Sequence, residues 1–212
     1  MNPLSALSPP PRAGARHVLL LSLTLLAAGC ASPPPPPPPP VESPTSRGPI
    51  LQIEQLDRGV QIVLPSVVLF DVNKATFNSA EAGPYLDRVA RLLTTKTQKA
   101  VAVEGHTDSD GSAPLNDSLS KARATAVAEA LLARGVQSSR LSTAGYSFNR
   151  PVASNATEAG KRLNRRVEII VLEEKVAMLT AGEPNGSFES AFARLKALVE
   201  SGQVKPVESA KP

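Results

Sequence analysis

The sequence predicts a two-layer α/β sandwich within residues 50–174 of the 212-residue chain. Short apolar stretches with the two-residue period of strands alternate with longer stretches that have the 3.6-residue period of helices. No long insertion without such a period separates them. Hydrophobic residues make up 42% of the chain, which is enough to build a core, but the 21 prolines are unevenly spread. We therefore expect one folded domain flanked by segments of a different character.

The first half of the predicted domain combines a strand pair with a helix. Apolar residues alternate with polar ones on either side of a turn at 57–59, which predicts two strands. Pro65 should interrupt the second strand, and residues 67–70 should resume it. From Pro84 onward, the apolar residues follow the spacing of a helix that has proline in its first turn.

The second half repeats the alternation of strand and helix. Residues 99–104 have the pattern of a buried strand, and Ser112 is placed to cap a helix that runs to Gly135. Glycine is common just after helix ends, which supports that boundary. The remaining expected elements are a strand at 140–146, a helix at 157–164 and a strand at 166–172.

The beginning of the chain resembles a bacterial lipoprotein signal. Basic residues precede an apolar run at 18–28, which is shorter than the ~20 residues needed to span a bilayer. The run ends in small residues before Cys30, although Ala27 stands where the signal usually has leucine. We expect residues 1–29 to be removed and several acyl chains on Cys30 to hold the protein on a membrane. A secretory signal followed by an unrelated cysteine is the alternative.

Residues 30–49 form a proline-rich linker after the lipidated cysteine. Eight consecutive prolines, 33–40, fix the backbone in an extended polyproline helix that rises ~3.1 Å per residue. A stiff spacer between the membrane and the domain is the interpretation that we favour. The alternative is a docking ligand for an aromatic groove of another protein.

The C-terminal tail, residues 175–212, contains an apolar stripe at helical spacing. An amphipathic helix is therefore expected there, which either packs back on the domain or binds a partner protein. The stripe consists of Phe188, Ala191, Phe192, Leu195, Leu198 and Val199.

The charge of the chain argues against nucleic-acid binding. The formal net charge is +4, and it falls to about +2 once Arg12 and Arg16 are removed with the signal. Only 3% of the residues are aromatic, so the chain lacks both the basic face and the stacking side chains that such proteins use.

Residues 105–123, GHTDSDGSAPLNDSLSKAR, gather the polar side chains that invite a chemical interpretation. A metal site with nitrogen and sulfur ligands is excluded, because His106 is the only histidine after the signal and the only cysteine is at the anchor. The aspartates lack the distal glutamate of a calcium loop. No nucleophile or metalloprotease motif accompanies them either. We predict no metal, no cofactor and no catalytic residue.

Binding of a ligand fits the same stretch better. Asp108 lies where a strand ends and a helix begins, close to outward-facing backbone N–H groups. Asn116, Ser120 and Arg123 share one face of that helix. A carboxylate and a guanidinium together complement a zwitterion, whose ammonium would meet Asp108 and whose carboxylate would meet Arg123. A salt bridge from Asp108 to Arg123, or a simple helix cap, would serve the fold alone.

Several motifs resemble the OmpA C-terminal-like domain, which occurs in peptidoglycan-associated lipoproteins, OmpA and flagellar MotB. The resemblance covers about residues 59–172, and its motifs follow one another in the family's order. They include Gly105-His106-Thr107-Asp108-Ser109-Asp110-Gly111, Asn116, Leu119-Ser120, Arg123-Ala124, Val127 and Asn164-Arg165-Arg166-Val167-Glu168, with Leu69-Phe70-Asp71 before them and Gly145-Tyr146 between.

The resemblance implies a mixed four-stranded sheet with helices on one face, and non-covalent binding of peptidoglycan. In the family, the aspartate and the arginine that correspond to Asp108 and Arg123 grip the meso-diaminopimelate of the stem peptide. Arg166 begins the last strand and is expected to serve the structure. The positions that match others at or near the family pocket are Thr107, Asn116, Leu119 and Arg165.

The signal, the linker and the domain together predict an outer-membrane lipoprotein that tethers the envelope to the cell wall. Ala31 after the anchor cysteine favours the outer membrane, with the domain in the periplasm. No reaction is expected, and a wall-editing hydrolase is the enzymatic rival. The other alternative is an envelope adaptor whose main partner is a protein, with wall binding as anchorage.

Overall fold

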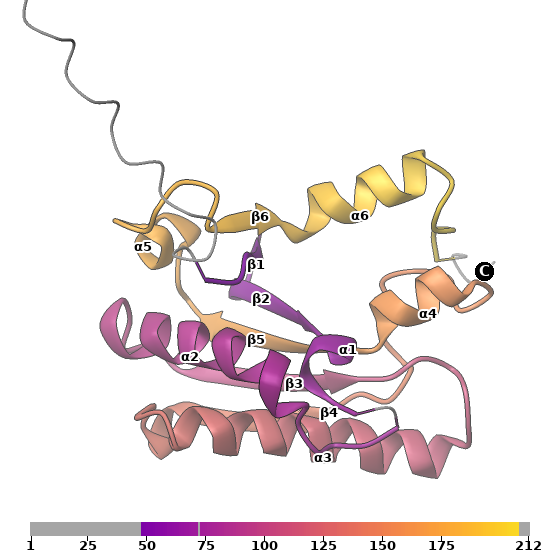
Figure 1. Cartoon of the computed structure of the whole chain (residues 1–212), viewed down its shortest axis with the longest axis horizontal. Coiled ribbons are helices and arrows are strands. Elements are labelled where there is room, and N and C mark those ends of the chain that lie inside the picture. Colours follow the sequence, from indigo (N-terminus) through magenta and orange to yellow (C-terminus); the bar gives the residue numbers. More distant parts are fainter. Residues whose placement is uncertain (1–47, 72, 208–212) are drawn as a thin grey trace, which may run out of the picture. The chain divides into compact units, whose positions relative to one another are not determined.

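Strands and helices alternate along the chain as the sequence predicts, and all strands join in one sheet (Figure 1). The computed structural model describes residues 48–71 and 73–207. The predicted signal, Cys30 and the proline run lie outside the described residues. The strands are β1 (Leu51–Leu56), β2 (Gly59–Pro65), β3 (Val101–His106), β4 (Leu141–Gly145), β5 (Arg166–Leu172) and β6 (Phe188–Ser190).

The sheet is mixed and has the strand order β4-β3-β5-β2-β1-β6. The pairs β3–β4 and β1–β6 are parallel, and the other neighbours are antiparallel. The α/β fold is thus confirmed, but the expectation of four strands was wrong because the sheet continues through β1 to β6. The last strand, β6, comes from the tail. Its Phe188 pairs with Leu51 of β1, so β6 covers the edge of β1.

Two helix boundaries differ from the sequence-based expectation. Residues 66–69 do not resume the strand after Pro65 but form a single helical turn, closed by Phe70 N–H donating to the Ser66 carbonyl at 2.8 Å. The next helix starts at Ser79, so Pro84 lies inside it and not in its first turn. The helices are α1 (Ser66–Leu69), α2 (Ser79–Thr95), α3 (Ala113–Leu132), the 3-10 turn η2 (Ser138–Arg140), α4 (Glu158–Asn164), α5 (Val176–Thr180) and α6 (Ala191–Glu200).

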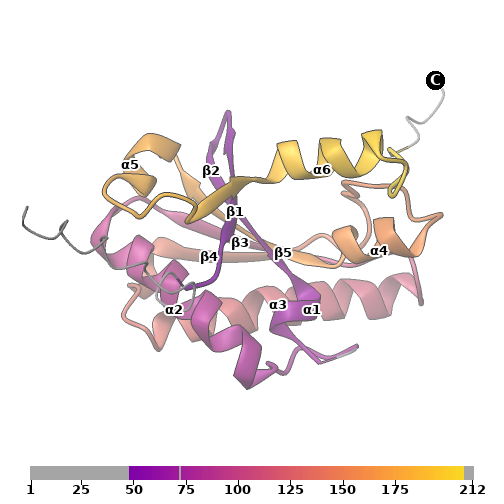
Figure 2. The same ribbon diagram turned by 45° about the horizontal axis from the view of Figure 1, so that its top comes forward.

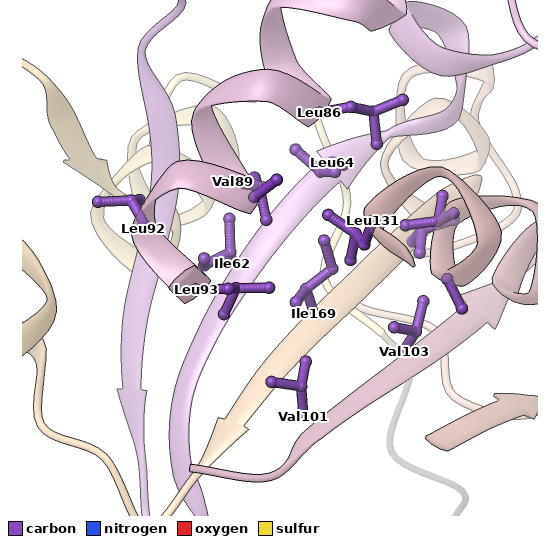
Figure 3. Packing of buried hydrophobic residues seen from close by; sticks show 14 of the residues in the cluster. Ile62, Leu64, Leu86, Val89, Leu92, Leu93, Val101, Val103, Leu131 and Ile169 are labelled. Atoms are coloured by element: carbon purple, nitrogen blue, oxygen red, sulfur yellow. The ribbon is translucent and has the colours of Figure 1, made fainter. Parts of the chain in front are cut away.

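The hydrophobic core lies between the sheet and the helices α2 and α3. Leu86, Val89 and Leu93 of α2 and Leu131 of α3 meet the branched side chains of β2, β3 and β5 (Figure 3). Alternate residues of each strand face this layer, because side chains of a strand point to opposite faces in turn. Figures 1 and 2 show α6 on the other side of the strands, so the helices are not confined to one face.

The described part of the C-terminal tail, residues 175–207, packs on the domain. The Glu183 carboxylate is almost fully buried and accepts two hydrogen bonds of 2.7 Å from the Arg91 guanidinium. Ser190 caps α6, and its hydroxyl donates to Glu54 of β1 at 2.7 Å. Of the two predicted roles for the apolar stripe, packing on the domain holds for Phe188, whereas no residue of α6 is fully buried.

Candidate ligand pocket at the end of the sheet

Three strand ends meet at one end of the sheet and form the base of a pocket. The register pairs Arg166, the first residue of β5, with Pro65 on one side and with His106 on the other. Pro65 is the last residue of β2 and His106 is the last residue of β3. The residues one step beyond this row are Ser66, Arg165 and Thr107. They come from three distant parts of the chain, and the Ser66 N–H donates to the Arg165 carbonyl at 2.9 Å.

A cavity of about 730 Å³ opens above these strand ends. Its walls come from α1, the segment that follows α1, the loop between β3 and α3, and the helices α3 and α4. The structure brings all six predicted peptidoglycan-contacting residues to this one cavity. They are Thr107, Asp108, Asn116, Leu119, Arg123 and Arg165.

Asp108 is buried at the base of the pocket and is already hydrogen-bonded. Its Oδ1 accepts from the Asp110 N–H at 3.0 Å, and its Oδ2 accepts from Arg165 Nη1 at 2.5 Å. The other terminal nitrogen of Arg165 donates to Glu158 at 2.8 Å. The ion-pair partner of Asp108 is therefore Arg165 and not Arg123. Each carboxylate oxygen of Asp108 retains a second lone pair for a ligand.

Arg123 is a buried cation without a carboxylate partner among the described residues. Only 4% of its surface is exposed. Its Nε donates to the Lys74 carbonyl at 3.0 Å, and its guanidinium lies over the Phe70 ring at 5.3 Å from the centroid. Burial, followed by the nearby charge of Arg165, lowers the pKa of Arg123 to about 10, so it stays protonated at neutral pH. The two terminal nitrogens of this cation are left for an anion.

Close packing of α3 on β3 sets the position of Arg123. A Cβ on Gly105 would come within 2.0 Å of the Ser120 carbonyl oxygen, so only glycine allows this approach. Ser120, about one turn before Arg123, also accepts a 3.0 Å hydrogen bond from the Ser147 N–H. At the start of the helix, Ser112 accepts from the Leu115 N–H as its N-cap, as predicted.

Asn116 and Leu119 contribute to the pocket in different ways. The Asn116 side chain is buried and donates to the Asp110 carbonyl at 2.8 Å, which holds the loop that carries Asp108. Leu119 lines the cavity as an apolar side chain. Asn116 is thus placed to position the loop.

Several residues that line the pocket were not predicted from the sequence to contact a ligand. Ser66 and Val67 of α1, and Phe70 just after it, line the cavity together with Glu158 and Arg162 of α4. Residues 67–70 were expected to continue a strand, which concealed the turn that puts Ser66 at the pocket. The predicted strand break at Pro65 was the signal in the sequence that could have indicated this part of the pocket. Residues that follow paired strand ends lie close together, but the pairing itself was not known from the sequence.

A second cluster of charged side chains lies on the sheet face away from α2 and α3. Glu104, His106 and Glu168 place potential metal-binding atoms within 4.8 Å of one another. However, Arg58 holds both oxygens of Glu104 at 2.7 and 2.8 Å, and Arg166 holds Glu168 at 2.7 Å. Because these cations already compensate the carboxylates, the cluster is an ion-pair network and a poor cation site.

His106 belongs to this second cluster and not to the pocket. Its ring is 1% exposed and stacks with Tyr146 at 5.6 Å, and neither ring nitrogen has a hydrogen-bond partner in the part of the chain that the structure describes. Burial, followed by the charge of Arg166, lowers its pKa to about 3. The imidazole is therefore neutral in the folded protein and supports the end of β3.

Residues 69–165 match the model of the OmpA family. These residues form an OmpA family domain. The matched range contains every predicted peptidoglycan-contacting residue, and it ends at Arg165.

Relatives of the OmpA family domain occur in different bacteria. The probable lipoprotein YiaD of Escherichia coli is 42% identical over 123 residues, which are 58% of this chain and 56% of YiaD. The peptidoglycan-binding protein ArfA of Mycobacterium bovis is 36% identical over 60% of this chain and 38% of ArfA. The chain thus spans about half or less of the length of these curated relatives.

Solved structures share the fold of the domain. The cell wall anchor of the T6SS from Pseudomonas aeruginosa has a TM-score of 0.53 and 32% identity, covering 60% of this chain and 89% of the other. The periplasmic domain of Helicobacter pylori MotB has a TM-score of 0.54 and 22% identity, covering 73% and 93%. Among the residues described here, no helix has the length and hydrophobicity to cross a membrane.

Proposed function

We propose that this protein is an outer-membrane lipoprotein that binds peptidoglycan non-covalently through the meso-diaminopimelate of the stem peptide. In this role it tethers the envelope to the cell wall. The OmpA family domain supplies the binding site, and the predicted acyl chains on Cys30 supply the membrane attachment.

The observation that carries this proposal is the Arg123 cation, which has no carboxylate partner among the described residues and lines the same cavity as Asp108. A buried guanidinium without a carboxylate is costly unless a ligand supplies the anion. A buried carboxylate with remaining lone pairs lies in the same cavity and can accept hydrogen bonds from an ammonium group. The far end of diaminopimelate is an amino acid that carries a carboxylate and an ammonium group. Its carboxylate would complement Arg123, and its ammonium group would complement Asp108.

The named relatives support the ligand and the location. One is named a peptidoglycan-binding protein, one a probable lipoprotein, and one solved structure is a cell wall anchor. These names concern the relatives, and they agree with the chemistry of the pocket. They also agree with a periplasmic place for the domain.

The mechanism that we propose is a three-part tether. Acyl chains on Cys30 insert in the outer membrane, the proline run crosses part of the periplasm, and the domain grips the wall. One zwitterion in an open pocket offers few atoms to bury, so the affinity of a single site should be modest. Many tethers on one polymer raise the effective strength by multivalency. No bond is made or broken in this scheme, so we expect no enzymatic activity.

Co-sedimentation with purified sacculi tests the proposal. The full chain in detergent is compared with Asp108→Ala and Arg123→Ala, and the thermal unfolding of each variant is recorded beside it. We expect the wild type to pellet with the wall and both variants to stay in the supernatant. Equal pelleting of all three proteins would contradict the site, and release of new muropeptides would indicate the hydrolase instead.

An envelope adaptor remains the second candidate, because α6 leaves a large aromatic residue exposed. Phe192 is 64% exposed near the start of α6, and no residue of this helix is fully buried. Such a side chain suits an interface with another protein, with wall binding as anchorage.

A point substitution tests the adaptor better than removal of the tail. Truncation after Glu174 would remove β6 from the sheet and leave Arg91 without Glu183. Phe192→Ser leaves both contacts in place. Retained wall binding together with an envelope defect in cells would favour the adaptor, whereas a normal envelope would argue against it.

A further inference from the structure

An exposed turn, Pro184-Asn185-Gly186-Ser187, connects α5 to β6 (Figure 1). The Ser187 N–H donates to the Pro184 carbonyl at 3.2 Å and closes the turn. Gly186 has a φ of 77°, which glycine adopts without strain. Asn185 and Gly186 are both exposed, so water has access to both residues.

The fold does not hold the polar groups of Asn185 and Gly186. Within the described residues, neither the Asn185 side-chain amide nor the Gly186 N–H makes a hydrogen bond. A Cβ placed on Gly186 would have no atom within 4 Å, so the turn is surrounded by open space. Asn164 is the opposite case, because it is fully buried and its amide donates to Ala153 and Asn155. Asn185 is also the only asparagine of the chain that precedes a glycine.

We propose that Asn185 is a site of spontaneous deamidation, and that its isoaspartyl product releases the C-terminal tail from β1. The main-chain nitrogen of Gly186 attacks the side-chain carbonyl carbon of Asn185. The new C–N bond closes a succinimide ring, and the amide nitrogen of Asn185 leaves as ammonia together with the proton of the Gly186 nitrogen. Glycine permits this ring closure because it has no side chain in the way.

Water completes the reaction by opening the succinimide. Addition of water at the former side-chain carbonyl restores the original main chain and gives aspartate. Addition at the main-chain carbonyl gives isoaspartate, in which the main chain runs through the former side chain. Nothing is oxidised or reduced, and water is the only co-reactant. This inference does not depend on the proposed function, because it concerns the tail and not the ligand pocket.

The position of the turn gives the isoaspartyl product a structural consequence. Before the turn, the buried Glu183 carboxylate binds Arg91 at 2.7 Å. After the turn, the Ser187 carbonyl accepts from the Leu51 N–H at 3.2 Å, and Phe188 pairs with Leu51. Isoaspartate adds one methylene group to the main chain between these two attachments. The pairing of β6 with β1 covers only three residues, so we expect this attachment to open.

Ageing of the full chain in mildly alkaline buffer tests the modification, because base removes the proton of the attacking nitrogen. Trypsin releases residues 176–194, in which Asn185 is the only asparagine. The mass difference between an amide and a carboxyl group should appear first in this peptide, at a rate close to that of the same synthetic peptide. Asn185→Gln is the matched control and should stay unmodified, because its longer side chain closes the ring slowly. An intact Asn185 in the full chain, when the synthetic peptide reacts, overturns the proposal.

Hydrogen exchange tests the release of the tail. The isoaspartyl form is separated from the unmodified chain by chromatography, and it should lose protection at the Leu51 amide and in β6. Freshly purified Asn185→Asp has the new charge without the added methylene group and should keep this protection. Unchanged protection of Leu51 in the isoaspartyl form overturns the release. Loss of protection in Asn185→Asp as well would overturn the lengthened main chain as its cause.

Discussion

Two charged clusters lie at the same end of β3, and they are built in opposite ways. In the closed cluster, formed by Arg58, Glu104, His106, Arg166 and Glu168, each carboxylate is held by an arginine. In the ligand pocket, by contrast, Arg123 has no carboxylate partner among the described residues. Arginines compensate both carboxylates of the closed cluster without a ligand, whereas the Arg123 cation of the pocket lacks such a counter-ion among the described residues.

The difference shows how consecutive residues acquire different tasks. Arg166 is the first residue of β5 and points to the closed cluster, while Arg165 precedes the strand and reaches the pocket. In the same way, His106 ends β3 and Thr107 lies beyond it. At these strand ends, one residue therefore serves stability and its neighbour lines the ligand pocket. Substitutions in the closed cluster should mainly affect stability, and substitutions in the pocket should mainly affect binding.

The largest expected effect is on stability, in the closed cluster. Glu168→Ala leaves the buried Arg166 cation without its carboxylate, which should lower the free energy of unfolding by about 3–5 kcal/mol. Urea unfolding measures the loss. The fraction that remains folded should bind the wall as the wild type does. A loss below about 1 kcal/mol would mean that water or another residue compensates Arg166.

The next largest effect is on binding, in the pocket. Arg123→Met keeps most of the side-chain length but removes the cation, so the affinity for meso-diaminopimelate should fall by about 2–5 kcal/mol. Its free energy of unfolding should change by less than about 1.5 kcal/mol, because only the contacts to Lys74 and Phe70 are lost. Calorimetry and urea unfolding measure the two quantities. Arg166→Met is the matched control and should show the reverse pattern.

The pH dependence of stability should distinguish the clusters through His106. Its pKa is about 3 in the folded protein, because of burial and then the charge of Arg166, and near the ordinary 6.5 when unfolded. Between these values the unfolded chain binds more protons. The contribution of His106 is therefore complete above pH 6.5 and falls by about 1.4 kcal/mol per unit as the pH decreases towards 3.

Urea unfolding of the wild type and His106→Asn at several pH values measures this slope. The variant should lack the part of the slope that His106 causes, whereas Arg123→Met should retain it. Parallel slopes for wild type and His106→Asn would show that the imidazole is not the titrating group.

The smallest effect is expected just outside the pocket. Asp117 of α3 is half exposed and pairs with Lys121 at 2.8 Å. Asp117→Asn should lower the free energy of unfolding by about 0.3–0.5 kcal/mol and leave wall binding unchanged. Asp108→Asn makes the same chemical change on a buried carboxylate and should abolish pelleting with sacculi. If Asp117→Asn also prevented pelleting, general charge rather than the pocket would determine binding.

Local patterns predicted the elements that depend on neighbouring residues. The cap Ser112, the helix expected at 157–164, the strand Arg166–Leu172 and the turn at 57–59 follow from backbone preferences over a few residues. The single turn of α1 could not be predicted in this way. The N–H of its first residue, Ser66, donates to the carbonyl of Arg165, which lies about a hundred positions later in the chain.

The sequence by itself determined the α/β class, the OmpA-like motifs and the two charges, Asp108 and Arg123, on which the ligand hypothesis depends. Only the tertiary structure decided which charges are paired. In the structure, Asp108 pairs with Arg165, Arg123 has no carboxylate partner within the described ranges, and Ser66 lines the pocket. The reason is that pairing depends on which strand ends meet across the sheet, and this register is set by long-range packing of the core.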